Sequence, residues 1–259
     1  MSSWRILVLC NDRATLAANL AASDDVRSRP DALVVEDNAP SAAIGINALL
    51  ARTPERYAIV AHQDVYLPKG WIARLLSAIS EIERDDPNWG VLGVYGVRTD
   101  GEHAGRVWSS GIGRVIGAPL AAPTPVGSLD ELLLVVNQTA ELRFDEDLPG
   151  FHLYGTDIVQ SALRMGRRSY VIDAPVVHNS QPVRSLSGAY MAAYRHMCRK
   201  WRGELPIETA VATLRRPVFL QSLRNIRRSR AVRARLRDAP SADAARPDPA
   251  LIARRLGFE

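Results

Sequence analysis

The alternation of short apolar runs with helical stretches constrains the fold of this chain most strongly. Each apolar run in the first half is short and stops at polar residues, as the buried strands of a parallel sheet do. The predicted strands are Trp4–Cys10, Asp31–Val35, Tyr57–Ala61 and Val91–Tyr95, and the predicted helices between them are Arg13–Ala22, Ala42–Ala51 and Trp71–Arg84. This order predicts an α/β fold with a mainly parallel sheet that helices cover on both faces.

The second half of the chain is less regular. Residues 98–127 are rich in Gly, Pro and Ser, a composition that predicts a loop with a hairpin insertion. The elements predicted after it are a strand at Leu129–Val136, a helix at Ile158–Met165, a short strand pair at Ser169–Ile172 and Val176–Val177, and a helix at Ala189–Trp201.

Composition indicates a globular protein with a full core. The 259 residues are 47% hydrophobic and 24% charged, and they suffice for one large domain or for one domain with an appendage. The longest apolar runs, such as Leu132–Val136, fall far short of the roughly 20 residues that span a bilayer, and Ile6–Cys10 is too short for a signal-peptide core. Cys10 and Cys198 form neither a disulfide framework nor a metal-ligand pair. We expect a cytoplasmic protein.

Positive charge is concentrated near the C-terminus. Arg184–Asp238 holds 14 basic and 3 acidic residues, a net charge of +11, which leaves a net charge of −6 on the rest of the chain. Within this range, Arg224–Arg237 is predicted as a basic helix, and the following segment, Ala239–Pro249, has linker composition. The helix could contact anionic lipid at the inner face of the membrane, bind an acidic polymer or nucleic acid, or pack as a solvated helix on the domain or on a second subunit. The absence of aromatic residues among the arginines disfavours nucleic acid.

Polar residues follow three of the predicted strands. They are Asp37 with Asn38, His62 with Asp64, and His178 after Val176–Val177. In open α/β sheets, ligands bind outside the carboxyl ends of the strands. A carboxylate and an imidazole with open coordination positions suit a divalent ion that also binds phosphate oxygens, and the imidazole favours Mn²⁺ over Mg²⁺. A structural zinc site would need four protein ligands.

A second group of chemically capable residues lies at Arg143–Asp157, where four carboxylates and one histidine occur together. Asp157 directly precedes the predicted helix at Ile158. It could be the N-cap of that helix or a general base positioned over an acceptor hydroxyl.

Taken in order, these motifs resemble family 2 glycosyltransferases of the GT-A fold. The motifs are Asp37-Asn38, Asn47 in the next helix, His62-Gln63-Asp64-Val65, Arg143-Phe144-Asp145-Glu146, Tyr154 with Asp157, and the strand-ending His178. Within that family the chain is most similar to the bacterial group named after a streptomycin-biosynthesis protein. The resemblance covers about residues 6–206, including Lys200-Trp201 and Leu205-Pro206. It implies a glycosyltransferase domain at 1–206 with a mixed, mainly parallel sheet, and a basic helical extension at 207–259.

The resemblance also implies residue roles. Asp37 and Asn38 would bind the donor nucleotide, with Asp37 reading the nucleobase, and Asp64 and His178 would hold the metal. His62 could be a ligand, a ribose contact or a residue that shapes the loop. Asp157 would be the catalytic base. The residues implied on the sugar and acceptor side are Asp130, Glu131, His152, Tyr154 and Thr156.

The implied reaction is transfer of a sugar from a UDP-, GDP- or dTDP-linked donor. The bound metal would neutralise the diphosphate leaving group, and one displacement by a hydroxyl would invert the anomeric centre. The acceptor would be a glycan, a lipid-linked glycan or a small molecule. The alternative is a non-catalytic module on the same fold that binds sugar nucleotides or glycans. The sequence leaves the oligomeric state open, including a homo-oligomer.

Overall fold

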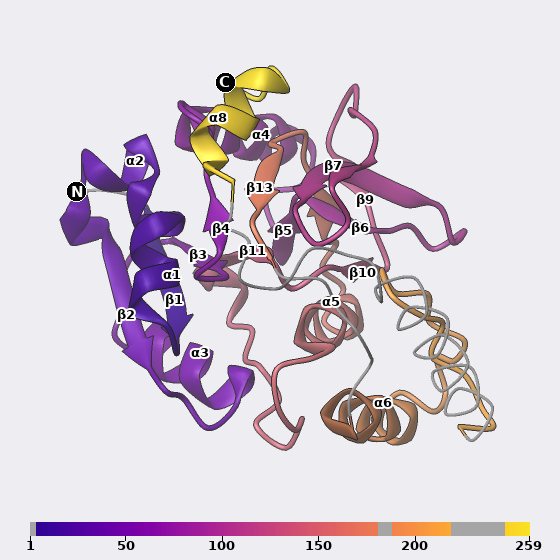
Figure 1. Ribbon diagram of the computed structural model, residues 1–259. Coiled ribbons are helices and arrows are strands. Elements are labelled where there is room, and N and C mark those ends of the chain that lie inside the picture. The colour runs from indigo at the N-terminus through magenta and orange to yellow at the C-terminus, as the bar shows by residue number, and fades with distance from the viewer. Residues whose placement is uncertain (1–3, 181–187, 219–246) are drawn as a thin grey trace.

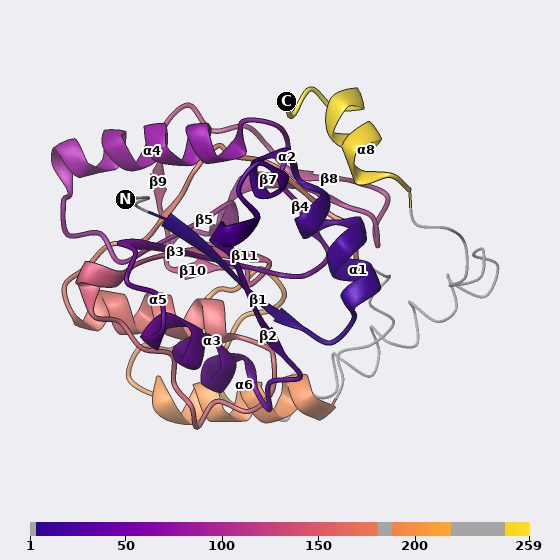
Figure 2. The same cartoon turned by 90° about the vertical axis from the view of Figure 1, so that its left-hand side faces the viewer.

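The computed structural model describes residues 4–180, 188–218 and 247–259 (Figure 1). Two β-sheets form the centre of the molecule, and helices lie on both sides of the larger sheet (Figures 1 and 2). No helix in these described ranges is long and apolar enough to cross a membrane.

The larger sheet has seven strands, of which five run in one direction. Its order is β2 (Leu33–Asp37), β1 (Trp4–Cys10), β3 (Tyr57–Ala61), β11 (Leu133–Asn137), β5 (Val91–Gly93), β12 (Tyr170–Val171) and β9 (Thr124–Pro125). β1 is parallel to β2 and β3, and β5 is parallel to β12. β11 is antiparallel to both β3 and β5, so β3 and β5 run in the same direction. The strands β2, β1, β3, β5 and β12 therefore share one direction, and β11 and β9 run in the opposite direction. The predicted α/β fold with a mainly parallel sheet is confirmed.

The smaller sheet has six strands. Its order is β10 (Ser128–Leu129), β6 (Tyr95–Val97), β7 (His103–Ser109), β13 (Val176–His178) and β4 (Val65–Tyr66), with β8 (Arg114–Gly117) paired to β7. The antiparallel pair β7–β8 is the hairpin predicted within residues 98–127.

The helices are α1 (Arg13–Ala18), α2 (Asp24–Arg27), α3 (Ala42–Ala51), α4 (Trp71–Asp85), α5 (Tyr154–Arg164), α6 (Gly188–Lys200) and α8 (Pro249–Arg255). Short 3₁₀ turns lie at Leu20–Ala22, Pro30–Ala32 and Gln138–Ala140. The α3 helix begins where the Ser41 hydroxyl accepts the Ile44 N–H, which satisfies one of the free donors of the first turn.

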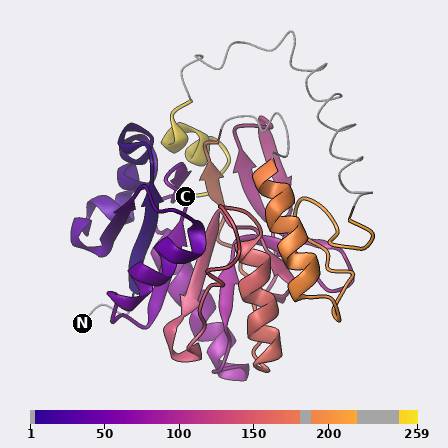
Figure 3. The same ribbon diagram turned by 90° about the horizontal axis from the view of Figure 1, so that it is seen from below.

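Alternate residues of the strands supply two cores, one on each face of the larger sheet. Leu7 and Val60 belong to the core under α3, α5 and α6, whereas Ile6 and Ile59 belong to the core under α4. Figure 2 shows α4 on one side of the sheet and α3, α5 and α6 on the other. Each fully buried apolar side chain stabilises the fold by about 1.5–3 kcal/mol. The α5 and α6 helices lie side by side, as the view from below also shows (Figure 3).

The predicted helix Arg13–Ala22 is wrong in its second half, because the chain leaves the helix at Asn19. The Asn19 side chain is fully buried, donates to the Thr15 carbonyl at 2.8 Å and accepts from the Asn179 amide at 2.9 Å. This use of the amide ends α1 at Ala18 and leaves a 3₁₀ turn in place of the last helical turn.

Two predicted strands are divided between the sheets. Val91–Tyr95 gives β5 in the larger sheet and the start of β6 in the smaller one, and Leu129–Val136 is divided between β10 and β11 in the same way. The strand predicted at Asp31–Val35 begins at Leu33, because the residues from Pro30 to Ala32 form a 3₁₀ turn. Periodicity alone cannot show that a strand changes sheets.

The predicted pairing of Ser169–Ile172 with Val176–Val177 is wrong. β12 pairs with β5 and β9, whereas β13 pairs with β7 and β4 in the other sheet. Asp173 lies between the two strands and accepts two hydrogen bonds from Arg106 of β7, at 3.1 and 3.2 Å. This bidentate pair directs the chain toward the smaller sheet.

The C-terminal helix α8 packs on the smaller sheet. Ala253 and Phe258 are buried against Tyr66 of β4 and Val177 of β13. The predicted basic helix Arg224–Arg237 and most of the predicted linker Ala239–Pro249 lie outside the described residues. The division into domains at 206 and 207 stays a prediction.

Candidate functional site

The carboxyl ends of β1 and β3 are joined by the side chain of Gln63. Its Oε1 accepts the backbone N–H groups of Asn11 and Asp12, both at 3.1 Å, and its Nε2 donates to the Asn11 side chain at 2.6 Å. Asp12 in turn caps α1 by accepting the N–H groups of Ala14 and Thr15. Gln63 thus sets the shape of this edge of the sheet, a role that the sequence did not show because its partners are distant in the chain.

Asp37 and Asn38 lie at the neighbouring end of β2. The Asp37 carboxylate pairs with the Arg13 guanidinium, and its side chain is 47% exposed. Asn38 has a left-handed backbone with φ of 52°, and its N–H donates to the Cys10 carbonyl at 2.9 Å. Asn tolerates this conformation better than most residues, which explains an amide at this turn. Both side chains are exposed at the same sheet edge as Gln63.

His62, Asp64 and His178 form a cluster in which one ligand atom from each residue lies within 4.8 Å of the others. His178 Nε2 lies 3.4 Å from Asp64 Oδ1, and the two imidazole rings have centroids 5.7 Å apart. All three side chains are partly exposed, so the cluster is open to a ligand. Two imidazoles and a carboxylate fit a divalent first-row ion that keeps open coordination positions.

Backbone pairing assembles this cluster from both sheets. His62 follows β3 of the larger sheet, and its carbonyl accepts the Val65 N–H, which turns the chain into β4 of the smaller sheet. β13 pairs with β4 so that His178 lies opposite Val65, and the Asn179 N–H donates to the Asp64 carbonyl at 2.8 Å. The predicted pairing of Asp64 with His178 is thus present in the geometry, and the structure adds His62 to it.

The electrostatics of the cluster keep Asp64 ionised. Burial alone would raise the pKa of Asp64, but the hydrogen bond and charge of His178 lower it to about 2. Burial lowers the pKa of His62, and a charge on His178 lowers it further. Burial also disfavours the charged form of His178, yet its hydrogen bond with Asp64 raises the pKa of that ring. An ionised carboxylate beside a neutral His62 is the state in which both groups can donate lone pairs to a cation.

Tyr154, the first residue of α5, contacts His62. Its hydroxyl lies 3.0 Å from His62 Nε2 and donates to the Glu131 carbonyl at 3.1 Å. A hydroxyl has one proton, so both hydrogen bonds form only when His62 Nε2 carries a hydrogen and donates it to Tyr154. That tautomer leaves Nδ1 as the ligand atom of His62.

Asp130 and Glu131 lie between β10 and β11, beside the first turn of α5. The Asp130 carboxylate accepts the Leu132 N–H at 3.1 Å. The Glu131 carboxylate interacts with the N–H groups of Leu153 and Gly155. Burial raises the pKa of Glu131 to about 8, with the Asp130 charge contributing in the same direction. The predicted sugar-side residues Asp130, Glu131 and Tyr154 therefore lie next to the cluster of His62, Asp64 and His178.

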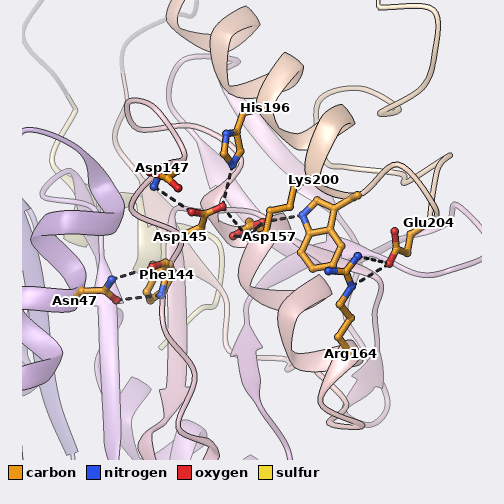
Figure 4. A network of polar contacts seen from close by, with 10 residues as sticks. Asn47, Phe144, Asp145, Asp147, Asp157, Arg164, His196, Lys200 and Glu204 are labelled. Carbon is orange, nitrogen blue, oxygen red and sulfur yellow. Dashed lines mark hydrogen bonds and ion pairs between the residues drawn. The ribbon is translucent and has the colours of Figure 1, made fainter.

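Asp157 lies in a different environment, shown in Figure 4. It is 1% exposed and belongs to the first turn of α5, so it is not the N-cap, which is Leu153. Lys200 Nζ lies 2.8 and 2.9 Å from its two oxygens, and Trp201 Nε1 donates to Oδ1 at 2.7 Å. Lys200 also binds Asp145 at 2.8 Å. These contacts tie α5 to α6.

The remaining predicted residues lie at the edge of this region. Thr156 is 1% exposed within α5. The partly exposed His152 ring packs edge-on against Tyr190 of α6, with centroids 5.6 Å apart, and the neighbouring Phe151 is 47% exposed. Asn47 of α3 fixes the segment before α5 through two hydrogen bonds with the Phe144 backbone, at 2.9 and 3.0 Å (Figure 4).

Comparison with known sequences gives a family and one curated relative. The model of a family described as "Glycosyltransferase like family" matches residues 18–201, a range that contains His62, Asp64, Asp157 and His178. The curated protein "ATP synthase subunits region ORF 6" of Fuscovulum blasticum is 30% identical over 162 residues. That alignment covers 61% of this chain and 64% of the relative, slightly under two thirds of its length.

Comparison with solved structures gives more distant similarities. A mannosyltransferase from Pyrobaculum calidifontis, in complex with GDP-Man and Mn²⁺, is 13% identical with a TM-score of 0.47, over 99% of this chain and 80% of that chain. TarS of S. aureus is 13% identical with a TM-score of 0.48, over 76% of this chain and 39% of that chain. The family assignment rests on the sequence match.

Proposed function

Because this chain belongs to the glycosyltransferase-like family, we propose that it moves a sugar from a nucleoside diphosphate sugar to a hydroxyl acceptor by a metal-dependent, inverting displacement. The observation that carries this proposal is the cluster of His62, Asp64 and His178 at the carboxyl edge of the sheet. Its position agrees with the rule that ligands of open α/β sheets bind outside the strand ends.

His62, Asp64 and His178 would hold the divalent ion, which supplies charge neutralisation of the departing diphosphate. Two nitrogen ligands favour Mn²⁺ over Mg²⁺, because Mg²⁺ prefers an all-oxygen shell. Three protein ligands leave coordination positions for phosphate oxygens. We assign the ligand atoms to His62 Nδ1, one Asp64 oxygen and a nitrogen of His178.

Asp37 and Asn38 are proposed to bind the nucleoside, since both are exposed at the end of β2. The Arg13 guanidinium holds the Asp37 carboxylate, and Gln63 fixes the neighbouring loop at Asn11. Asp130, Tyr154 and the partly exposed His152 would line the sugar and acceptor side. The buried Asp157, with both oxygens bound to Lys200, is better suited to joining helices than to taking a proton from an acceptor.

A thermal-shift panel tests the donor site. Each ligand is added with Mn²⁺, with Mg²⁺ or with EDTA. The ligands are the nucleotides UDP, GDP and dTDP and the nucleotide sugars UDP-glucose, UDP-N-acetylglucosamine, GDP-mannose and dTDP-glucose. Binding to the native state at a hundred times the Kd stabilises it by about 2.7 kcal/mol. We expect a shift with one nucleotide that requires Mn²⁺ and is weaker with Mg²⁺.

Asp64→Asn serves as the matched variant, because it keeps the shape of the side chain and removes the anionic ligand. The metal-dependent shift should disappear in this variant. The nucleotide sugar that binds is then incubated with water as the acceptor, and release of the nucleoside diphosphate is measured. Release distinguishes a transferase from a binding module. A panel without any metal-dependent shift contradicts the proposed donor site.

A further inference from the structure

Helix α6 presents a row of arginines to solvent. Arg195, Arg199 and Arg202 are exposed, and they follow one another at the four- and three-residue intervals that place side chains on one face of a helix. Tyr194 and Met197 point inward and are fully buried. Among the described elements, α6 is the outermost on its side of the larger sheet (Figure 2). We call these three arginines the α6 basic surface.

A further exposed arginine adjoins α6. The Tyr194 hydroxyl accepts the Arg215 N–H at 3.0 Å, and the Cys198 thiol donates to the Arg215 carbonyl at 3.8 Å. These contacts fasten the segment around Arg215 to the helix, and the next residue, Arg216, is exposed. The positive charge near α6 therefore extends beyond the helix itself.

Within the described ranges, no carboxylate pairs with the α6 basic surface. Arginines elsewhere do have such partners, as Arg168 has in Asp86 and Arg106 has in Asp173. The acidic side chains next to α6 are bound by other groups: Asp145 by Lys200 and His196, and Glu204 by Arg164. The three guanidinium groups therefore keep their full charge for an external anion.

Apolar side chains are exposed beside the C-terminal end of this surface. Arg164 of α5 pairs at 2.7 Å with Glu204, which follows closely after Arg202 in the chain. On either side of Arg164, Leu163 is 39% exposed and Met165 is 52% exposed. Basic residues combined with exposed apolar ones are typical of a surface that lies on a membrane, where apolar groups enter the lipid and basic groups meet anionic headgroups.

Nucleic acid fits this surface less well. Proteins that bind single strands stack the bases on exposed aromatic side chains. The aromatic residues of α6, Tyr190 and Tyr194, are both buried. An anionic bilayer requires only positive charge and apolar contact.

We propose that the α6 basic surface docks this protein on a bilayer that contains anionic lipids. The arginines attract the negatively charged headgroups, and Leu163 and Met165 contact the boundary of the acyl chains. Tyr190 of the same helix packs against His152 of the candidate site. The docked bilayer and the candidate site therefore share α6.

Co-sedimentation of the full chain with lipid vesicles tests the proposal. The vesicles contain phosphatidylcholine alone, or phosphatidylcholine and phosphatidylserine in a ratio of two to one. The wild type should bind the vesicles with phosphatidylserine, and added salt should weaken this binding because it screens the charges. Each arginine near an anionic surface contributes a factor of about five, so the triple variant Arg195→Gln, Arg199→Gln and Arg202→Gln should bind about 100-fold more weakly.

Two matched variants serve as controls. Arg84→Gln, Arg114→Gln and Arg255→Gln together remove the same charge from exposed positions on α4, β8 and α8, and this variant should bind within about threefold of the wild type. α4 and α8 lie on the other side of the molecule from α6 (Figure 2). Lysine in place of all three arginines of the α6 basic surface keeps the charge and should preserve binding.

Three outcomes would overturn the proposal. Wild-type affinity in the α6 glutamine variant would show that other residues bind the vesicles, because the arginines of 224–237 are present in every variant. An equal loss in the α4, β8 and α8 variant would show that net charge alone matters. A wild type that binds duplex DNA or RNA but no vesicles would assign the surface to nucleic acid.

Melting temperatures show that each variant is folded. Should the triple glutamine variant not fold, Arg199→Gln alone should cost about fivefold in vesicle affinity, and wild-type affinity rejects the surface. The assay contains neither a nucleotide sugar nor Mn²⁺, so its result is independent of the proposed transfer reaction.

Discussion

The hydroxyl of Tyr154 and Nε2 of His62 lie 3.0 Å apart, and this contact determines which nitrogen of His62 can bind a cation. Because Tyr154 donates its own proton to the Glu131 carbonyl, it must accept from His62. Partners of this kind fix the orientation of a ligating imidazole, and their loss typically costs 10–100-fold in metal affinity.

Tyr154→Phe should therefore weaken Mn²⁺ binding by about 10–100-fold while the ring keeps its edge-on packing against Phe144. Isothermal titration with MnCl₂ measures the effect. Tyr170→Phe is the control, since its hydroxyl donates to Asp86 at the rim of the sheet. Equal Mn²⁺ affinity in Tyr154→Phe and wild type would show that the hydroxyl does not orient His62.

Each histidine of the cluster can be tested as a ligand. His62→Ala and His178→Ala should both lose the Mn²⁺-dependent thermal shift, whereas His103→Ala, on the exposed end of β7, should keep it. If His62→Ala binds Mn²⁺ as the wild type does, the ion is held by Asp64 and His178 alone, and His62 has one of the other roles that the sequence left open.

Asp157→Asn should destabilise the fold by about 3 kcal/mol, because Lys200 would lose a buried anionic partner. Urea unfolding followed by circular dichroism measures the loss. The exposed pair of Arg164 with Glu204 offers a comparison, and Glu204→Gln should cost under about 1 kcal/mol. A stable Asp157→Asn protein without activity would instead restore Asp157 as the base.

Acid should weaken the contact between α6 and the segment before α5. Burial would raise the pKa of Asp145, but its hydrogen bonds from Lys200 and His196 lower it. A carboxyl with a depressed pKa in the folded state contributes stability above its unfolded value of about 3.9, and that stability is lost as the pH falls through the folded value. The free energy of unfolding should therefore fall below about pH 4, and Lys200→Met should reduce this dependence. An unchanged pH profile in Lys200→Met would contradict the assignment.

Gly155→Ala should cost on the order of 1–3 kcal/mol, because the new Cβ would lie 2.6 Å from the Leu129 carbonyl oxygen. Gly203→Ala is the control, since a Cβ there meets nothing within 4 Å. Melting temperatures of the two variants give the comparison. A neutral Gly155→Ala would mean that the first turn of α5 can shift without cost.

The local sequence pattern was sufficient to predict much of the fold. Trp4–Cys10, Ala42–Ala51 and Tyr57–Ala61 have the predicted bounds because their signals lie within the segment: an apolar run, a serine cap, or a change from apolar to polar residues. The cluster at His62 and Asp64 was visible for the same reason.

The contacts that define the site are long-range. His178 meets Asp64 only because β13 pairs with β4 in one register, and Tyr154 meets His62 only because α5 begins four residues before the predicted start. The pairing of Asp157 with Lys200 and Trp201 depends on α6 lying beside α5. No periodicity within a segment reports such distances, so the partners of the Asp157 carboxylate became visible only in three dimensions.

His62 continues from the larger sheet, while Asp64 and His178 are fixed by the pairing of β4 with β13 in the smaller one. An ion bound by all three residues would cross-link the two sheets. Its affinity would therefore depend on the position of one sheet relative to the other. Apolar residues far from these three side chains, such as Phe258 packed against β13, would then also affect donor binding. Variation in the hydrophobic core of this protein should be constrained by its ligand as well as by its folding.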